Sequence, residues 1–190
     1  MKETLKEIFA HRPKRCIMDD SRRRSAVLIP MYYRAGQYYI VFTKRTEKVR
    51  EHKGQMSFPG GAYQEEDGTL INTALRESAE EIGLKPGDVE ILGELDDEVA
   101  RTTNYIISPF VAIIPWPYRF QVDAEEVEEI IEVPIATLLD KSCLRQEVEI
   151  DNGVPTAAFF YHCLGVVIWG ATARILTQLL DIIVHAQSSV

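Results

Sequence analysis

The sequence has few cysteines, and none lie at a spacing typical of a metal or redox site. Cys16, Cys143 and Cys163 are far apart in the chain of 190 residues and form no C-x-x-C motif. An odd number of widely spaced cysteines argues against a disulfide framework and against a zinc site. We therefore predict a reducing compartment, the cytoplasm, and no disulfide framework.

An excess of basic residues is also missing. The chain has 21 Lys and Arg against 29 Asp and Glu, which gives a formal net charge of −8. Proteins that bind nucleic acid through its backbone usually carry a basic excess. We predict no nucleic-acid partner, and we expect any polyanionic substrate to be held by local positive charge and metal.

Long uninterrupted hydrophobic runs are absent as well. The most apolar stretch, residues 164–184, contains Arg174, Gln178 and Asp181, which indicates a core helix rather than a membrane span. The first nine residues alternate charged and apolar side chains and lack the apolar core of a signal peptide. We predict no association with a membrane.

Hydrophobic periodicity and turn residues predict helices and strands that do not alternate strictly. This is typical of an α+β fold in which a mixed sheet lies between helices. We predict one domain over residues 1–190, with a helix and a basic arm in 1–24 and the core in 25–185. The basic arm either contacts a partner subunit or stays mobile. The predicted helices are 2–10, 73–82, 126–131 and 168–183, and the predicted strands are 26–30, 38–43, 55–58, 89–95, 106–114, 147–150 and 157–161, with Gly36 turning the first hairpin.

Three carboxylates in the predicted helix 73–82 are the most informative feature. Glu77, Glu80 and Glu81 are spaced at i, i+3 and i+4, so they project from one side of a helix and repel one another. A solvated acidic surface is the simpler interpretation. Against it, the acids do not alternate with lysines, and Gly60 and Gly61 end the preceding apolar segment in a tight turn. Because Mg²⁺ prefers carboxylate, water and phosphate oxygens, the cluster indicates metal-assisted chemistry on a phosphate compound.

A basic group precedes these acids. Arg45, Arg50, His52 and Lys53 lie in a charged segment that is either a solvated loop or a phosphate-binding element. We predict that Arg45 and Arg50 bind substrate phosphate, since the overall negative charge requires local compensation. Gly60 and Gly61 would let the backbone approach metal or phosphate closely.

The other conspicuous side chains are predicted to be structural. Trp169 and Tyr161 are expected to pack in the core or on the sheet rather than to stack on a base. Cys143 and Cys163 have no adjacent base, so a thiol nucleophile is not expected.

Two motifs resemble those of a known family. Gly61, Asp67 and residues 76–84 resemble the Nudix box, G-x5-E-x7-R-E-U-x-E-E-x-G-U, in which U is a bulky apolar residue. The chain departs from it at Asp67, which replaces Glu, in the eight residues between Asp67 and Arg76, and at Ser78. The R-E-x-x-E-E-x-G core is intact.

Upstream, residues 41–61 resemble the L-L-T-x-R-[SA]-x3-R-x3-G-x3-F-P-G-G motif of the coenzyme A pyrophosphatase branch. Thr46 stands where Ser or Ala is usual. The resemblance implies a Nudix fold that holds Mg²⁺ or Mn²⁺. It also implies hydrolysis of coenzyme A or acyl-coenzyme A to adenosine 3′,5′-bisphosphate and (acyl-)4′-phosphopantetheine. Two alternatives stay open: hydrolysis of another nucleoside diphosphate derivative, such as an ADP-sugar, NADH or a dinucleotide, and a non-catalytic nucleotide sensor.

The predicted roles of the residues follow from this chemistry. Glu77, Glu80 and Glu81 are the expected metal ligands. Arg76 is expected to orient Glu77 or Glu80 rather than to touch phosphate. The general base is either one of these acids or a carboxylate from residues 123–129, with Glu126 favoured. The expected partner is a coenzyme A-like nucleotide, and a homodimer is possible.

Overall fold

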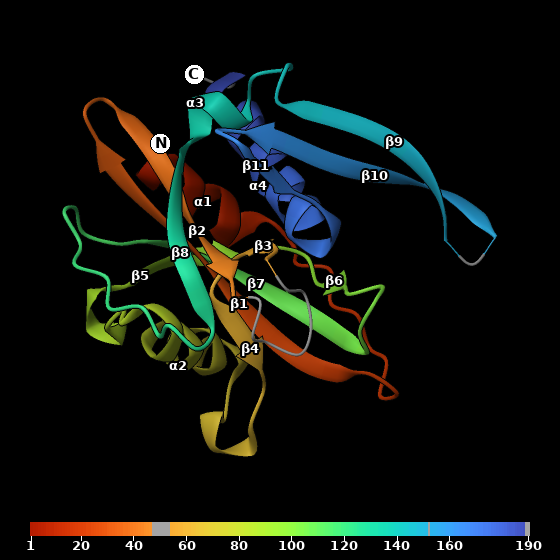
Figure 1. Cartoon of the computed structure of the whole chain (residues 1–190), viewed down its shortest axis with the longest axis horizontal. Coiled ribbons are helices and arrows are strands. Elements are labelled where there is room, and N and C mark those ends of the chain that lie inside the picture. The colour runs from red at the N-terminus through yellow and green to blue at the C-terminus, as the bar shows by residue number, and fades with distance from the viewer. Residues whose placement is uncertain (47–53, 152, 189–190) are drawn as a thin grey trace.

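The computed structural model describes residues 1–46, 54–151 and 153–188, which form two sheets and four α-helices (Figure 1). The helices are α1 (Lys2–His11), α2 (Leu70–Ile82), α3 (Ile135–Leu138) and α4 (Gly170–Ser188), with short 3-10 turns η1 (Glu65–Asp67) and η2 (Pro86–Asp88). The strands are β1 (Arg23–Arg34), β2 (Gln37–Arg45), β3 (Met56–Ser57), β4 (Gly60–Ala62), β5 (Glu90–Glu94), β6 (Glu98–Val99), β7 (Tyr105–Ile113), β8 (Val127–Pro134), β9 (Leu144–Asp151), β10 (Val154–Cys163) and β11 (Val166–Ile168).

The main sheet is mixed and is built around β1. Its path is β3-β2-β1-β7-β5, and β4, β6 and β8 pair with β1, β7 and β2. The pairing of β1 with β7 is parallel, whereas β2 and β4 run antiparallel to β1. A second, antiparallel sheet has the order β11-β10-β9. The predicted α+β architecture is therefore confirmed.

Helices cover both faces of the main sheet. Ala26 and Leu28 of β1 belong to the hydrophobic cluster that α2 completes, whereas Ile29 and Met31 belong to the cluster that α1, α4 and the second sheet complete. The alternation follows from the two-residue period of a strand. In Figure 1, α2 lies below and to the left of the sheet, and α4 with the second sheet lies above and to the right.

The sheet divides at β1, and this division creates the site described below. Residues 31–34 of β1 pair with β2, whereas residues 25–27 pair with β4. Gly60 makes the second contact possible, because a Cβ there would lie 2.3 Å from the carbonyl oxygen of Ala26. Between these two regions of β1, the N–H of Leu28 donates to the carbonyl of Pro59 at 2.9 Å. The loop before β4 therefore runs along β1 between β4 and β2.

The predicted first hairpin is confirmed. β1 and β2 pair antiparallel up to Arg34 and Gln37, with Ala35 and Gly36 in the turn. Both turn residues have positive φ, 48° and 88°, a conformation that glycine adopts without strain.

The prediction of a helix over residues 126–131 was wrong. Residues 127–134 form β8, which pairs antiparallel with β2 from Val127 opposite Arg45 to Pro134 opposite Tyr39. The β-branched residues Ile130 and Ile131 suit this strand, and pairing with the edge of β2 outweighs the helix propensity of the glutamates on either side of them. The C-terminal helix also begins later than predicted, because residue 168 ends β11.

The prediction of no disulfide framework was wrong for one pair. Cys143 and Cys163 are joined, with Cα atoms 5.5 Å apart, which is a usual separation for disulfides. The backbone N–H of His162 donates to the carbonyl of Cys143 at 2.7 Å, so the end of β10 meets the start of β9. Sequence spacing could not reveal this contact across 20 residues.

The basic arm lies against the body of the protein. Asp97, which is 1% exposed, accepts hydrogen bonds from the backbone N–H of Ile17 at 3.1 Å and from Arg24 at 3.0 Å. Asp96 forms an ion pair with Arg12. The structure therefore does not show the free, mobile arm that was one of the two predicted alternatives.

Within the described part of the chain, we find no helix that combines the length and the hydrophobicity needed for a membrane span.

Candidate active site

Helix α2 presents the three acids, and its two ends are defined by capping residues. Thr69 accepts a hydrogen bond from the backbone N–H of Asn72 at 3.3 Å at the N-terminal end. Gly83 adopts the left-handed conformation, with φ of 67°, at the C-terminal end. The predicted helix over residues 73–82 is therefore confirmed, and it begins earlier, at Leu70.

Glu81 lies in the division of the main sheet and is only 3% exposed. Its carboxylate accepts a hydrogen bond from the backbone N–H of Gly60 at 3.3 Å and lies 3.7 Å from Nη1 of Arg45. Burial raises the pKa of Glu81 to about 8, against the opposing effect of Arg45 and the Gly60 N–H. The repulsion from Glu77 and Glu126 adds to the rise. Glu81 is thus a buried acid whose charge is incompletely compensated.

Glu77 lies against the second glycine of the loop. A Cβ at position 61 would lie 2.5 to 2.7 Å from the carboxyl atoms of Glu77, so only glycine leaves room for this group. Burial raises the pKa of Glu77, Arg76 opposes this change, and Glu80 and Glu126 add to it. Gly60 and Gly61 therefore bring the backbone to Glu81 and Glu77 respectively.

Arg76 connects three carboxylates. Its Nε and Nη2 donate to the two oxygens of Asp67 at 2.7 and 3.0 Å, and its Nη1 donates to Glu77 at 2.8 Å and to Glu80 at 3.0 Å. Asp67 is 9% exposed and also accepts from the hydroxyl of Thr73 at 2.8 Å. The hydrogen bond from Arg76 is the main reason that the pKa of Asp67 lies well below its usual range.

Asp67 was not predicted as a site residue. The sequence presented it as a departure from a motif, whereas in the structure it fixes the plane of the Arg76 guanidinium. Its burial and its cationic partner, nine residues away in the sequence, become visible only in the structure.

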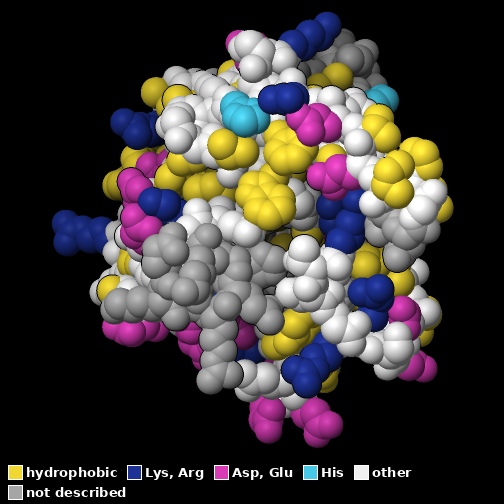
Figure 2. All heavy atoms as spheres, turned by 45° about the vertical axis from the view of Figure 1, so that its right-hand side comes forward, with side chains coloured by type: hydrophobic (Ala, Val, Ile, Leu, Met, Phe, Trp, Pro, Cys, Tyr) yellow, Lys and Arg dark blue, Asp and Glu magenta, His cyan; other side chains and the backbone are white. Residues whose placement is uncertain are grey.

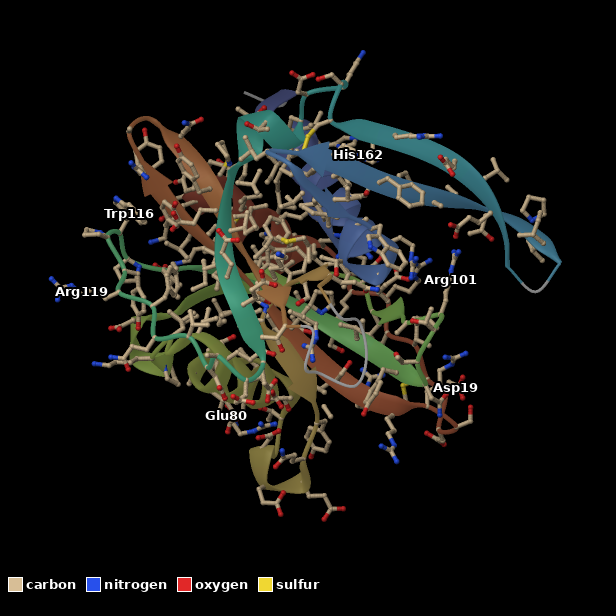
Figure 3. The ribbon with its side chains drawn as sticks, in the orientation of Figure 1. Asp19, Glu80, Arg101, Trp116, Arg119 and His162 are labelled. Carbon is tan, nitrogen blue, oxygen red and sulfur yellow. A yellow bond between two sulfur atoms is a disulfide. The ribbon has the colours of Figure 1, made fainter. Side chains whose placement is uncertain are left out.

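Glu80 differs from its two neighbours because its side chain is 61% exposed. In Figure 3 it lies beside α2, above the yellow loop at the bottom of the view. Its recorded partner is Arg76.

Glu126 lies in the loop before β8, and backbone hydrogen bonds fix this loop beside the acids. The carbonyl of Glu126 accepts from the N–H of Thr46 at 2.9 Å, and the N–H of Asp123 donates to the carbonyl of Glu81 at 2.9 Å. After burial, the largest cause, the charge of Glu126 is among the causes that raise the pKa of Glu77 and Glu81. The structure therefore brings Glu126 to the two acids beside the glycines.

The acids suit a hard divalent cation, although they are not already gathered around one. Within residues 1–46, 54–151 and 153–188, no three His, Cys, Asp or Glu side chains form a ready-made metal cluster. However, Glu81 is buried and Glu77 is half-buried, and their charges repel each other. A divalent cation bound by carboxylate oxygens removes both costs, so the donor set fits such an ion.

A pocket of about 360 Å³ is lined by Gly60 and Gly61 but by none of these acids. Arg45, Gly60 and Gly61 line its inner end, and Phe160 and Trp169 line its far wall. Figure 2 shows this face, with hydrophobic side chains gathered above a central hollow. The pocket thus lies between the two glycines beside the acids and an aromatic wall.

Two sequence predictions have different outcomes here. Trp169 was predicted to pack in the core or on the sheet; it is 40% exposed and lines this pocket, so it is not a core residue. Tyr161, also predicted to pack, is 1% exposed and belongs to the core. Arg50 lies outside the described residues, and its role stays a prediction.

Comparison with known proteins decides the family. A family model described as the NUDIX domain matches residues 22–151. The chain belongs to the Nudix family. A protein from Photorhabdus laumondii named "Uncharacterized Nudix hydrolase NudL" is 33% identical over 167 residues, covering 88% of this chain and 87% of that protein. A protein of the same name from Enterobacter sp. (strain 638) is 37% identical over 163 residues, covering 84% and 82%.

Solved structures share the fold of this Nudix chain. A MutT/nudix family protein from Enterococcus faecalis has a TM-score of 0.61 at 12% identity, covering 97% of this chain and 75% of that one. The NUDIX domain of Shewanella oneidensis NrtR, solved with ADP ribose, has a TM-score of 0.51 at 20% identity, covering 70% and 84%. At these identities the likeness shows the Nudix fold alone, which the sequence predicted.

The family also sets the general reaction. The chain is a Nudix hydrolase, and Nudix hydrolases act on nucleoside diphosphate derivatives, generally with divalent metal cations. The sensor alternative is thereby set aside.

Proposed function

We propose that this Nudix hydrolase cleaves the diphosphate bond of coenzyme A or an acyl-coenzyme A. The products are adenosine 3′,5′-bisphosphate and 4′-phosphopantetheine or its acyl form. The observation that carries the proposal is the continuous pocket from Arg45 and the two glycines to an aromatic wall. Its volume of about 360 Å³ suits one half of such an elongated substrate. The resemblance of residues 41–61 to the coenzyme A motif supports the choice of substrate.

The residues of α2 and its flanking loop would hold Mg²⁺ or Mn²⁺. Glu77, Glu80 and Glu81 are the proposed ligands. Once bound, such an ion neutralises phosphate oxygens and lowers the pKa of a water molecule. Arg76 keeps Glu77 and Glu80 in position through hydrogen bonds of 2.8 and 3.0 Å. We assign Arg76 to positioning rather than to substrate contact, because Asp67 already holds its other two nitrogens.

Glu126 is the proposed general base. It lies in an exposed part of the loop before β8, and its charge acts on both Glu77 and Glu81. Its carboxylate would accept the proton from the water that attacks the diphosphate. The fixed backbone of this loop keeps the carboxylate within reach of the acids.

Arg45 is the proposed diphosphate ligand. Among the described residues, its buried Nε has no hydrogen-bond partner. An unpaired buried donor of this kind is costly, and a phosphate oxygen in the pocket would satisfy it. Arg45→Ala should lower kcat/KM by about 10- to 150-fold, the usual range for a hydrogen bond to a charged group. Arg119→Ala is the matched control, because Arg119 lies on the other side of the molecule (Figure 3).

A substrate panel tests the proposal. The purified protein is incubated with Mg²⁺ or Mn²⁺ and with coenzyme A, ADP-ribose, NADH or a diadenosine polyphosphate, and new phosphomonoesters are quantified. Preferential hydrolysis of coenzyme A, abolished in Glu81→Gln, supports the proposal. Turnover of the other compounds alone refutes the coenzyme A assignment and points to a different nucleoside diphosphate derivative.

A further inference from the structure

The pocket wall farthest from the acids is aromatic and comes from the second half of the chain. Phe159 and Phe160 of β10 and Trp169, between β11 and α4, all line the pocket. Trp169 keeps 40% of its surface exposed, although an indole contributes most when it is buried. An exposed tryptophan inside a pocket indicates a surface that a ligand covers.

The two tryptophans of the chain differ in one respect. The ring of Trp116 already stacks on Tyr32, with centroids 4.4 Å apart and planes 14° apart. Among the described residues, no aromatic ring stacks on Trp169 in this way. The face of Trp169 is therefore available to a planar group that enters the pocket.

The charges around the pocket indicate which half of the substrate enters it. Arg45 lies at the inner end, and Arg101, in the loop between β6 and β7, also lines the pocket. Arg101 extends toward the β9–β10 hairpin (Figure 3), where its Nη1 lies 3.7 Å from Glu149. The nucleotide half of coenzyme A carries phosphates on its ribose, whereas the pantetheine arm is uncharged. Arg45, Arg101 and Arg174 line the pocket with one acid, Glu149, and this excess of cations suits the nucleotide half.

We propose that Trp169, with Phe160 beside it, forms the platform on which the adenine ring of the substrate stacks. The proposal rests on the proposed function, since it assigns one half of that substrate to the pocket. A flat base offers a π-face to an indole, whereas the flexible pantetheine arm does not. The pantetheine half of the bound substrate would then extend from the diphosphate past the acids.

Tryptophan fluorescence tests this assignment without turnover. Trp116→Phe leaves Trp169 as the only tryptophan, and Trp169→Phe leaves only Trp116. Each variant is titrated with adenosine 3′,5′-bisphosphate and, separately, with 4′-phosphopantetheine. We expect saturable quenching only for the nucleotide with Trp116→Phe. Quenching by 4′-phosphopantetheine alone, or no quenching by the nucleotide, overturns the proposal.

Kinetics provides the second measurement. Trp169→Ala should raise KM for coenzyme A about 5- to 150-fold, the range of a lost base–aromatic stack, with kcat changed less than about threefold. Trp169→Phe should restore most of the affinity, because it keeps a ring. Equal KM values in Trp169→Ala and the parent overturn the proposal.

The two proposals can fail separately. If coenzyme A is not hydrolysed but the nucleotide still quenches Trp169, the substrate assignment fails and the stacking platform stands. If coenzyme A is hydrolysed and Trp169 does not respond to the nucleotide, the platform fails and the proposed function stands.

Discussion

Glu81 is expected to destabilise the metal-free protein at neutral and alkaline pH. It is 3% exposed, and burial is the main reason that its pKa rises from an ordinary 4.5 to about 8. Glu81→Gln removes the titrating group but keeps the shape of the side chain. We expect this variant to lose hydrolysis and yet to be more stable than the parent at pH 8 without metal. Stability and activity are then opposed at one residue.

The sign of the effect follows from proton binding. Between pH 4.5 and about 8, the unfolded chain has lost the proton of Glu81 while the folded chain keeps it. The unfolded state thus binds fewer protons, and the free energy of unfolding falls as the pH rises. The whole shift corresponds to at most about 5 kcal/mol, at 1.36 kcal/mol per pH unit. Local relaxation around a buried charge reduces this, so we expect about 2 kcal/mol.

Urea unfolding in EDTA at pH 5, 6, 7 and 8 measures this term. The parent should lose about 2 kcal/mol across the series relative to Glu81→Gln. Glu80→Gln is the matched control, because the Glu80 side chain lies on the same helix but is 61% exposed. It should follow the pH dependence of the parent. Parallel curves for the parent and Glu81→Gln would refute the reasoning.

Three further variants test other parts of the structure. Burial raises the pKa of Asp97, but hydrogen bonds from a serine, a backbone N–H and a lysine outweigh it and lower the pKa. The ionised carboxylate therefore stabilises the folded protein above pH ~4, and this stabilisation is lost in more acidic solution. Asp97→Asn should cost about 2–4 kcal/mol at pH 7 and flatten that acid limb in urea titrations. Asp67→Asn should weaken the hold on Arg76 and lower kcat about 10- to 100-fold, with more metal needed for half-maximal activity; an unchanged metal requirement contradicts this. Gly61→Ala should displace the Glu77 carboxylate and lower kcat/KM at least ~100-fold. Its circular dichroism melt should stay within about 4 °C of the parent, and normal turnover would contradict the steric assignment.

Local signals were sufficient for some elements. Helix α2 has its acids, its Thr69 cap and its Gly83 terminus within one short segment, so the sequence alone predicted it. The β1–β2 hairpin likewise depends on a turn at Gly36 and on two adjacent apolar runs. In both cases the residues that determine the structure are close together in the chain.

Other features depend on contacts between distant segments. Residues 127–134 form a strand because they pair with the edge of β2. The sequence of these residues does not show that this edge is available. Asp67 could not be assigned from the sequence because its partner Arg76 meets it only after helix α2 has formed. Trp169 is exposed because it lines a pocket together with residues of β10 and α4, and this arrangement exists only in the folded chain.

Distant stretches of chain contribute to the site. The proposed metal ligands and the two glycines come from residues 60–81, on the main sheet and α2, whereas the aromatic wall comes from β10 and the segment before α4. The proposed metal ligands and the proposed stacking platform can therefore diverge independently. Exchanging residues 154–169 with those of a relative would alter which compounds are accepted while leaving the hydrolytic machinery in place.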